Sequence, residues 1–375
     1  MAAAIRIAAD GSHCRCQPLF LRYSIVMTAH DLARLRLSAQ HIAQADFATS
    51  EAVVRHLGAL QAQDYAGAQW SIGLRMSQAA EFDIEQAVID RRIVRSWPQR
   101  GTLHFVPPEE LRWRLRLAAP RVLAAARRRH QELELTPADF TKAQELVTTA
   151  LQGDRRLARP ALLQLLEAGG LSTAGQRGYH LLWQLAQTGH ICFGPLEGRQ
   201  PTIALLDDWV PPAPAISRAE ALARLVVGYF SSHGPATLRD LAWWSGLTRA
   251  ELKQGLAAVE DQLDSVVVAD TTYYLAPNLR PAESSQAYLL PGFDEFILGY
   301  ADRSAALDPA NAERICPGGN GLFRPTVVLD GRVVGTWQRG RRQSDQAAIV
   351  TAFGEPLDKI QLQTSQQRYA RYRVR

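Results

Sequence analysis

The sequence ISRAEALARLVVGYFSSHG, residues 216–234, opens the segment that decides the fold. Its apolar side chains recur at helical spacing, at Leu222, Leu225, Val226 and Phe230. Gly234 and Pro235 then interrupt the pattern, because glycine is favoured at the end of a helix and proline cannot continue one. Residues 216–234 are therefore predicted to contain a helix that ends at this Gly-Pro pair.

Two more helices and a hairpin are predicted directly after this helix. TLRDLAWWSG (237–246) and LTRAELKQGLAAVEDQL (247–263) each begin beside a threonine that suits an N-cap, Thr237 and Thr248. VVVAD and TTYYLAP, within residues 266–277, are two short β-rich runs. Three helices and a two-stranded wing are typical of a winged helix, a nucleic-acid-binding variant of the helix-turn-helix. Its core is expected to contain two neighbouring tryptophans, Trp243 and Trp244.

The same order of elements is predicted upstream, from residue 136 to residue 210. TPADFTKAQELVTTALQ begins with Thr136 and Pro137, a favourable pair for the first positions of a helix. RPALLQLLEAGG and GQRGYHLLWQLAQTG supply two more helices, and HICFGPLEGRQPTIALL supplies a hairpin. The proline-rich stretch WVPPAPAIS (209–217) is a stiff connector to the next unit.

The first copy of the pattern is looser, and the C-terminal part differs from all three copies. ATSEAVVRHLGALQAQD (48–64) and RRIVRSWPQRGTLHFVPP (91–108) supply a helix and two strands. Near the C-terminus, Asp330-Gly331 stands between β-branched runs and predicts a hairpin. DKIQLQTSQQRY (358–369) is also interpreted as β-rich. The predicted fold is α+β: three tandem winged-helix domains at 27–135, 136–210 and 216–281, then a β-rich, barrel-like domain at 285–375.

Composition indicates an ordinary soluble protein with a basic bias. The chain has 375 residues, enough for several domains, and a formal net charge of +5. Of its 42 Lys and Arg residues, 39 are Arg, which fits either phosphate and guanine recognition or a GC-rich genome. Residues 1–26 are predicted to be an N-terminal extension, since Met27 opens the regular pattern. Their apolar stretch PLFLRYSIVM is too short to span a membrane.

The four cysteines favour a reducing cytoplasm over an oxidising compartment. They are too few for a disulfide framework in a chain of this length, and the pair Cys14 and Cys16 has no second pair at zinc-finger spacing. We therefore expect neither a metal nor a cofactor.

Two glutamines, Gln61 and Gln63, stand one residue apart in LGALQAQD (57–64). An amide cannot take a proton from water at pH 7, but it can hold a water molecule in place. Side chains two residues apart on a helix diverge by about 200°, so the pair converges only if the helix ends here. The alternative is two ordinary polar residues at a helix end. A second such pattern, Gln361-Leu362-Gln363, lies in a predicted strand and is assigned a structural role.

Several segments together resemble one family. They are LQAQD (60–64), RSWPQRGTLHFV (95–106), GPATLRDLAWWSGL (234–247), LLPGFDEFILGYADRS (289–304) and PTVVLDGRVVGTW (325–337). In this order they resemble the winged-helix DNA glycosylases of the AlkZ/YcaQ type, which unhook interstrand cross-links and excise N7-alkylated purines. The resemblance covers nearly everything from Met27 onward. It implies that Gln61-Ala62-Gln63 is the catalytic Gln–apolar–Gln motif, with Ala62 smaller than the usual middle residue.

The chemistry of the implied substrate suits neutral amides. An N7-alkylated purine is a cation and therefore leaves the sugar readily, through an oxocarbenium-like transition state. Two carboxamides that orient water and face the growing positive charge could then suffice. A base tethered to the opposite strand cannot swing out freely. An open site that spans a groove is therefore expected.

Other polar residues are weighed in the same way. Arg100, Thr102 and His104 alternate along a strand and are candidates for DNA contact, although packing is the common role of a lone strand histidine. Arg332, beside a hairpin tip, is a candidate for a narrow minor groove. Asp64 could act as a base or cap a helix. Three further acidic residues could run glycosidic chemistry but are interpreted as a solvated acidic loop: Asp294, Glu295 and Asp302.

The sequence thus predicts a monofunctional, metal-independent DNA glycosylase. Its catalytic residues are Gln61 and Gln63, and its DNA-binding residues are Arg100, Thr102, His104 and Arg332. The expected partner is double-stranded DNA carrying alkylated or cross-linked purines, with no membrane and a monomeric protein. The alternatives are a non-catalytic winged-helix transcriptional regulator and, third, a module whose winged helices bind protein. The preferred adduct is left open.

Overall fold

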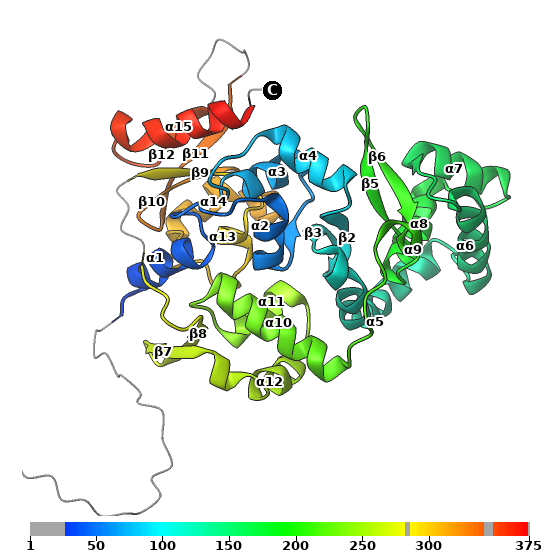
Figure 1. The fold of residues 1–375 in the computed structure, drawn as a ribbon, viewed down its shortest axis with the longest axis horizontal. Coiled ribbons are helices and arrows are strands. Elements are labelled where there is room, and N and C mark those ends of the chain that lie inside the picture. The colour runs from blue at the N-terminus through cyan, green and yellow to red at the C-terminus, as the bar shows by residue number, and fades with distance from the viewer. Residues whose placement is uncertain (1–26, 282–285, 341–347, 374–375) are drawn as a thin grey trace, which may run out of the picture.

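The computed structural model describes residues 27–281, 286–340 and 348–373, and it is a mixture of helices and sheets (Figure 1). This confirms the α+β class at that level. The predicted extension, residues 1–26, lies outside the described residues. No helix in the described part of the chain is long and apolar enough to cross a membrane.

The segment predicted as the third winged helix, residues 216–281, has the predicted order of elements. Helices α10 (Arg218–His233), α11 (Leu238–Ser245) and α12 (Arg249–Ala257) precede strands β7 (Asp264–Val268) and β8 (Thr271–Leu275). Thr237 and Thr248 cap α11 and α12, each accepting a backbone N–H three residues on. The prediction for the tryptophans is half right. Trp244 is buried, but Trp243 is 47% exposed, because neighbouring helical residues point about 100° apart.

The two upstream hairpins are joined in one six-stranded sheet. Arg95 of β2 pairs with Phe193 of β5, and this pairing links the hairpin β2–β3 to the hairpin β5–β6. Short strands flank them at both edges. The strand order is β1 (Leu60–Gln61), β3 (Thr102–Val106), β2 (Val94–Gln99), β5 (Ile191–Glu197), β6 (Gln200–Leu205) and β4 (Leu157–Ala158). The first two copies of the pattern therefore share a sheet, whereas β7 and β8 form a separate one.

Helices surround this sheet, and α6 to α8 lie on the opposite side of the molecule from α15 (Figure 1). The first group contains α1 (Ala29–Ala39), α2 (Ser50–Leu57), α3 (Tyr65–Gly73), α4 (Glu81–Ile89) and α5 (Pro108–Glu132). The second group contains α6 (Pro137–Leu151), α7 (Arg159–Ala168), α8 (Arg177–Gln187) and α9 (Leu206–Trp209). Single 3-10 turns are found at Ala174–Gln176, Glu260–Gln262, Pro309–Asn311 and Pro317–Gly319.

The C-terminal region is less β-rich than predicted. Its four antiparallel strands form an open sheet in the described residues, in the order β12 (Ala348–Ala352), β11 (Arg332–Arg339), β10 (Thr326–Leu329) and β9 (Ala287–Leu290). The Asp330-Gly331 hairpin is confirmed, but of the segment 358–369, residues 359–369 belong to helix α15 (Lys359–Arg373) and not to a strand. The alternation of polar and apolar residues in Gln361-Leu362-Gln363 is too short to identify a strand. The buried residues of α15 instead have helical spacing: Ser365, Tyr369 and Tyr372.

Two short helices, α13 (Glu295–Leu298) and α14 (Ala312–Ile315), belong to the chain between β9 and β10. One hydrophobic core contains residues of the first segment, such as Leu57 and Phe105, together with C-terminal residues such as Leu289 and Trp337. The proposed domain boundaries stay predictions, and this core is shared across them. The LLPGFDEFILGY segment is thereby held against the first sheet.

Candidate active site

The segment Gln61-Ala62-Gln63 begins at the last residue of strand β1 and continues into the bend that precedes α3. Helix α2 ends at Leu57, and Gly58 follows with a φ of +73°. This left-handed backbone conformation favours glycine, and a Cβ at Gly58 would also require Nη2 of Arg114, 2.4 Å away, to shift. Gln61 and Gln63 therefore do not belong to a helix, and the divergence of about 200° between such residues on a helix does not apply to them. Gln61 is half-buried and Gln63 is exposed, so neither amide is sealed in apolar packing.

Two contacts from the sheet fix the middle of the segment. The N–H of Ala62 donates to the carbonyl of Leu103 at 2.7 Å. Arg95 donates to the carbonyl of Ala62 from both Nε and Nη2, at 3.1 and 2.9 Å. Arg95 is buried, and its guanidinium stacks near the rings of Tyr65 and Phe193. Burial lowers the pKa of Arg95 to about 10, so the group is still a cation at neutral pH.

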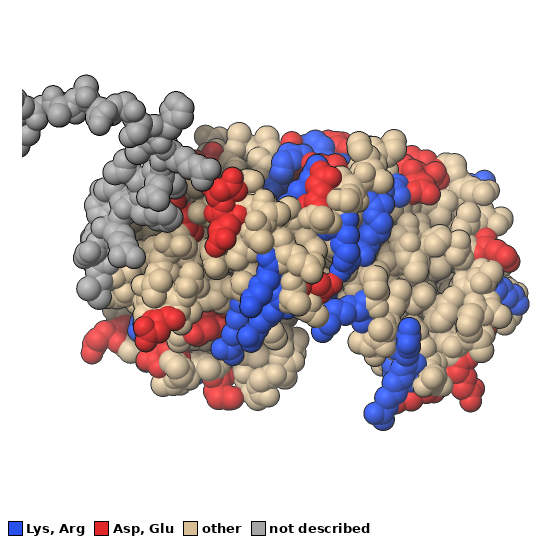
Figure 2. Space-filling view, turned by 90° about the horizontal axis from the view of Figure 1, so that it is seen from below, with Lys and Arg blue, Asp and Glu red and all other residues tan. Residues whose placement is uncertain are grey.

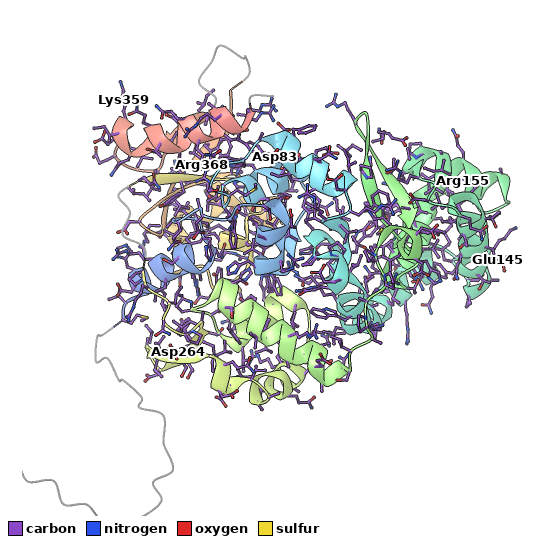
Figure 3. All side chains as sticks on the ribbon, viewed as in Figure 1. Asp83, Glu145, Arg155, Asp264, Lys359 and Arg368 are labelled. Carbon is purple, nitrogen blue, oxygen red and sulfur yellow. The ribbon has the colours of Figure 1, made fainter. Side chains whose placement is uncertain are left out.

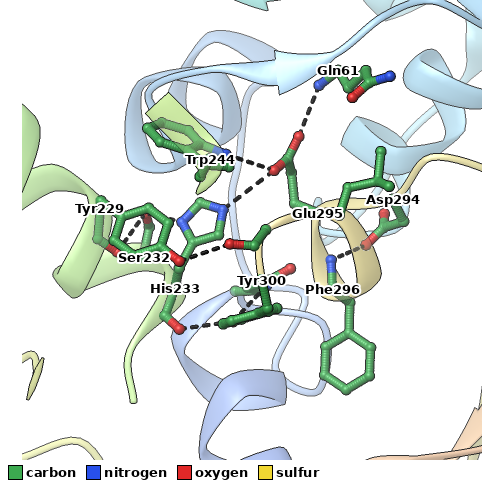
Figure 4. A network of polar contacts seen from close by, with 12 residues as sticks. Gln61, Tyr229, Ser232, His233, Trp244, Asp294, Glu295, Phe296 and Tyr300 are labelled. Atoms are coloured by element: carbon green, nitrogen blue, oxygen red, sulfur yellow. Dashed lines mark hydrogen bonds and ion pairs between the residues drawn. The ribbon is translucent and has the colours of Figure 1, made fainter. Parts of the chain in front are cut away.

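The backbone of Gln61 is held by a buried carboxylate. Its N–H donates to Oε1 of Glu295 at 2.9 Å, and Nε1 of Trp244 donates to Oε2 of Glu295 at 2.9 Å (Figure 4). Nε2 of His233 lies 3.4 Å from the same Oε2. In Figure 4 the amide of Gln61 points away from this network. The prediction that Glu295 belongs to a solvated acidic loop is wrong, because its side chain is fully buried.

Glu295 is ionised despite its burial. Burial alone would raise its pKa, but the hydrogen bond and charge of His233, with smaller contributions from His104 and the Gln61 N–H, lower the pKa to about 2. His233 is itself held in place. Its ring stacks on Tyr229 with centroids 4.7 Å apart, and its carbonyl accepts the hydroxyl of Tyr300 at 2.7 Å (Figure 4). The carboxylate therefore joins α10 and α11 to the glutamine segment.

Asp294 is buried in the same turn, and it too departs from the solvated-loop prediction. It forms a two-pronged ion pair with Arg75, with Nη1–Oδ2 and Nη2–Oδ1 distances of 2.9 Å. The hydroxyl of Ser71 donates to Oδ2 at 2.5 Å. Asp302 alone of the three acidic residues is exposed. Asp294 thus fastens α13 to the first helical layer, and it has no access to a substrate.

The three candidates on β2–β3 lie in different environments. His104 pairs with Gln61 across β1 and β3 but is fully buried, and burial lowers its pKa to about 4. Its Nδ1 donates to the carbonyl of Thr102 at 2.9 Å. Such burial fits packing and does not fit contact with DNA. Thr102 and Arg100 are partly exposed at the hairpin end, where Arg100 and Gly101 both have positive φ.

Arg332 is exposed at the start of β11, but the hairpin tip beside it rests on α1. Asp330 forms ion pairs with His30 and Arg34 at 2.9 and 3.0 Å. A Cβ at Gly331 would lie 2.9 Å from Ala33, so the tip packs closely. The arginine side chain is therefore presented from a fixed turn.

Asp64 is exposed, next to Gln63, at the N-cap position of α3, and its side chain makes no capping hydrogen bond. Asp64 thus occupies the capping position of α3 but does not make the hydrogen bond by which an aspartate caps a helix. No group of three or more potential metal ligands lies together in the described part of the chain. The site consists of amides with a carboxylate beside them.

Sequence reasoning gave no role to Arg95, and it misplaced Glu295. Both belong to the segments that carried the family resemblance, which was the available signal. On the surface, basic side chains gather in the middle of one face, where a notch separates two lobes (Figure 2). Several arginines of the Arg-rich helix α5 are, however, paired within the protein. Examples are Arg112 with Asp207 and Arg114 with Glu110.

Known proteins match most of this chain. The model of the AlkZ-like DNA glycosylase family matches residues 54–372. An interstrand DNA cross-link repair glycosylase from Streptomyces sahachiroi is 27% identical over 320 residues, covering 80% of this chain and 84% of the relative. The solved structure of the S. sahachiroi DNA glycosylase AlkZ superposes with a TM-score of 0.77 at 25% identity, covering 92% of this chain and 96% of that one. This chain therefore belongs to the AlkZ-like DNA glycosylase family.

Proposed function

We propose that this protein is a monofunctional DNA glycosylase that hydrolyses the N-glycosidic bond of N7-alkylated purines and unhooks interstrand cross-links. The observation that carries the proposal is the placement of Gln61 and Gln63. Their amides are accessible, while the backbone between them is held by Glu295, Arg95 and Leu103. A fixed backbone with free amides suits the positioning of a small nucleophile.

In the proposed reaction, Gln61 and Gln63 hold a water molecule against the anomeric carbon. The C1′–N9 bond breaks and its electrons neutralise the cationic purine, while the water oxygen bonds to C1′. The proton lost by that water passes to solvent. Because the leaving group already carries a positive charge, no strong general base is required.

Glu295 supports this reaction from behind the segment. Its carboxylate bonds the Gln61 backbone and does not face the substrate, so it is a positioning residue. A negative charge in a buried setting also attracts the positive charge that grows on the sugar, since the screening there is weaker than in water. Both effects favour the oxocarbenium-like transition state.

The proposed substrate is duplex DNA bound by a monomer, with Arg100, Thr102 and Arg332 as candidate contacts. Arg332 presents an exposed guanidinium group suited to phosphates, and Arg100 lies partly exposed at the hairpin end; contacts with phosphate should weaken as salt rises. His104 is not included, because its side chain is buried. The location in the cell is proposed to be the cytoplasm.

The test compares Gln61→Ala and Gln63→Ala with a matched control, Gln363→Ala. Gln363 belongs to the second Gln-x-Gln pattern and is exposed on α15. Release of N7-methylguanine from a methylated duplex is measured under single-turnover conditions, together with the Kd for the same duplex. We expect each active-site variant to lose about 100-fold or more in rate, with little change in Kd. The control should match wild type.

Unchanged release in both active-site variants would refute the catalytic role. Sequence-selective DNA binding without any base release would instead favour the non-catalytic regulator. A cross-linked duplex tested in parallel would determine whether unhooking depends on the same two glutamines.

A further inference from the structure

Trp243 presents a large aromatic surface to solvent beside the candidate active site. It is 47% exposed, whereas its neighbour Trp244 is 1% exposed and bonded to Glu295. Nε1 of Trp243 donates to the carbonyl of Leu298 at 3.3 Å. The indole is thus anchored at its polar edge, and its ring surface is left partly uncovered. Large exposed aromatic rings on a fixed element commonly mark recognition surfaces.

Two arginines flank this ring. The guanidinium carbons of Arg100 and Arg303 lie 5.8 and 5.5 Å from its centroid. Arg303 is oriented by a hydrogen bond from its Nε to the carbonyl of Ile297 at 2.8 Å. Nε and Nη2 of Arg100 are buried and have no hydrogen-bond partner among the described residues. The cluster therefore combines an aromatic surface with two cations, one of which has two nitrogens without hydrogen-bond partners among the described residues.

The cluster adjoins the glutamine segment. Glu295 binds the backbone of Gln61, and Leu298, which binds Trp243, lies one helical turn further along α13, about 5 Å away. Arg100 lies at the tip of the β2–β3 hairpin, and β3 pairs with β1 at Gln61. The same two elements, α13 and the β2–β3 hairpin, thus hold both the reacting amides and the tryptophan cluster.

A cavity continues from the cluster toward α5 and α8. Its volume is about 400 Å³, and Arg100, Ser245 and Gly246 form the wall nearest Trp243. The far wall is again aromatic and basic, with Arg121, Arg129, Tyr179, His180 and Trp183. A volume of this size is within the range of pockets that bind small organic groups.

We propose that the Trp243 cluster binds an unpaired nucleobase, the one opposite the reacting purine, with the adjoining phosphate beside Arg100 and Arg303. This inference rests on the proposed glycosylase function. Once the purine departs, the opposite base has no partner and is the least costly base to unstack. Indole rings stack on any base, and guanidinium groups complement phosphate. The positive charge of the cluster favours this anionic ligand over an apolar protein segment.

The test places 2-aminopurine opposite a non-hydrolysable abasic analogue in a duplex. Wild-type protein should quench the probe, because stacking on an indole quenches its fluorescence. Trp243→Ala should abolish the quenching and weaken binding about tenfold, and Trp243→Phe should retain most of both. The matched control is Phe82→Ala, which removes another exposed aromatic ring, 64% exposed, from α4. Equal quenching by wild type and Trp243→Ala would overturn the proposal.

A second measurement separates this proposal from the glycosylase function. Release of N7-methylguanine is assayed with the same proteins and an unmodified opposite base. Quenching that needs Trp243, in a protein without base release, would support the base site and refute the enzymatic proposal. Base release without Trp243-dependent quenching would support the enzymatic proposal and refute the base site. An unfolding midpoint of Trp243→Ala equal to that of the wild type would show that the variant is folded, so that a loss of quenching reports the loss of the indole.

Discussion

Two segments of this chain carry the same side chains at the same spacing on different backbones. Gln61 is the last residue of β1 and Gln63 lies in the bend after it, while Gln361 and Gln363 lie in the first turns of α15. On a helix such a pair diverges by about 200°, and this constraint does not apply to the non-helical segment of Gln61 and Gln63. The helix keeps the second pair of amides apart, whereas the backbone of the first pair does not impose that separation, as the proposed function requires.

The two segments also differ in what holds them. Buried charged groups bond the peptide units of the first segment, Glu295 at Gln61 and Arg95 at Ala62. Helix α15 is instead attached by its side chains, including Tyr369 and Arg368, which lies beneath the helix on the side toward α3 (Figure 3). A Gln-x-Gln pattern thus gains a function only where the backbone is fixed and the amides are free.

Removing Glu295 should give the largest effect. Glu295→Ala leaves His233, the Trp244 N–H and the Gln61 N–H without their buried acceptor, which should lower the free energy of unfolding by about 3–5 kcal/mol. Glu295→Gln keeps the shape and should cost less. Both should slow base release at saturating DNA more than they raise the Kd. Urea unfolding and single-turnover assays measure this, and wild-type stability in Glu295→Ala would contradict the anchoring role.

Acid should weaken the same anchor. The folded pKa of Glu295, about 2, lies below its ordinary value of 4.5, so its ionised form stabilises the fold above pH 4.5. That contribution, about 3 kcal/mol, should be lost as the pH falls from about 4.5 toward 2. The measurement is the difference in urea midpoint between wild type and Glu295→Gln. A difference that stays constant between pH 6 and pH 3 would show that the carboxylate is not held ionised.

Removing Arg95 should have a smaller effect on stability. Arg95→Met retains an unbranched apolar side chain but loses both hydrogen bonds to the Ala62 carbonyl, which should cost about 1.5–3 kcal/mol. Because the glutamine segment loses its support, base release should fall with it. The free energy of unfolding and the single-turnover rate are measured together.

Arg368→Met is the matched control for Arg95→Met. Arg368 also donates to backbone carbonyls, those of Gly73 and Met76, but it does so beneath α15. Its loss should reduce stability and leave the rate of base release intact. An equal loss of activity in both variants would mean that the effect of Arg95 is general destabilisation.

Much of the fold could be predicted from local signals, and the support of the site could not. Thr237 and Thr248 mark the starts of α11 and α12, because a helix start depends on adjacent residues. Glu295 lacks any such signal. Its burial is set by partners 51 to 234 residues away in sequence, so its surroundings cannot be inferred from the neighbouring letters. The joining of two hairpins through Arg95 and Phe193 is equally nonlocal.

The smallest effect is expected in the second Gln-x-Gln segment. Alanine is a better helix former than glutamine, and Gln363 is exposed on α15, so Gln363→Ala should change the free energy of unfolding by less than about 0.5 kcal/mol. Gln361, which is half-buried on the same helix, should behave similarly, because its amide makes no hydrogen bond to another described residue. Urea unfolding of the double variant Gln361→Ala/Gln363→Ala measures both. A loss above 1 kcal/mol would mean that the helical pair has a structural role of its own, and the contrast with Gln61 and Gln63 would then rest on activity alone.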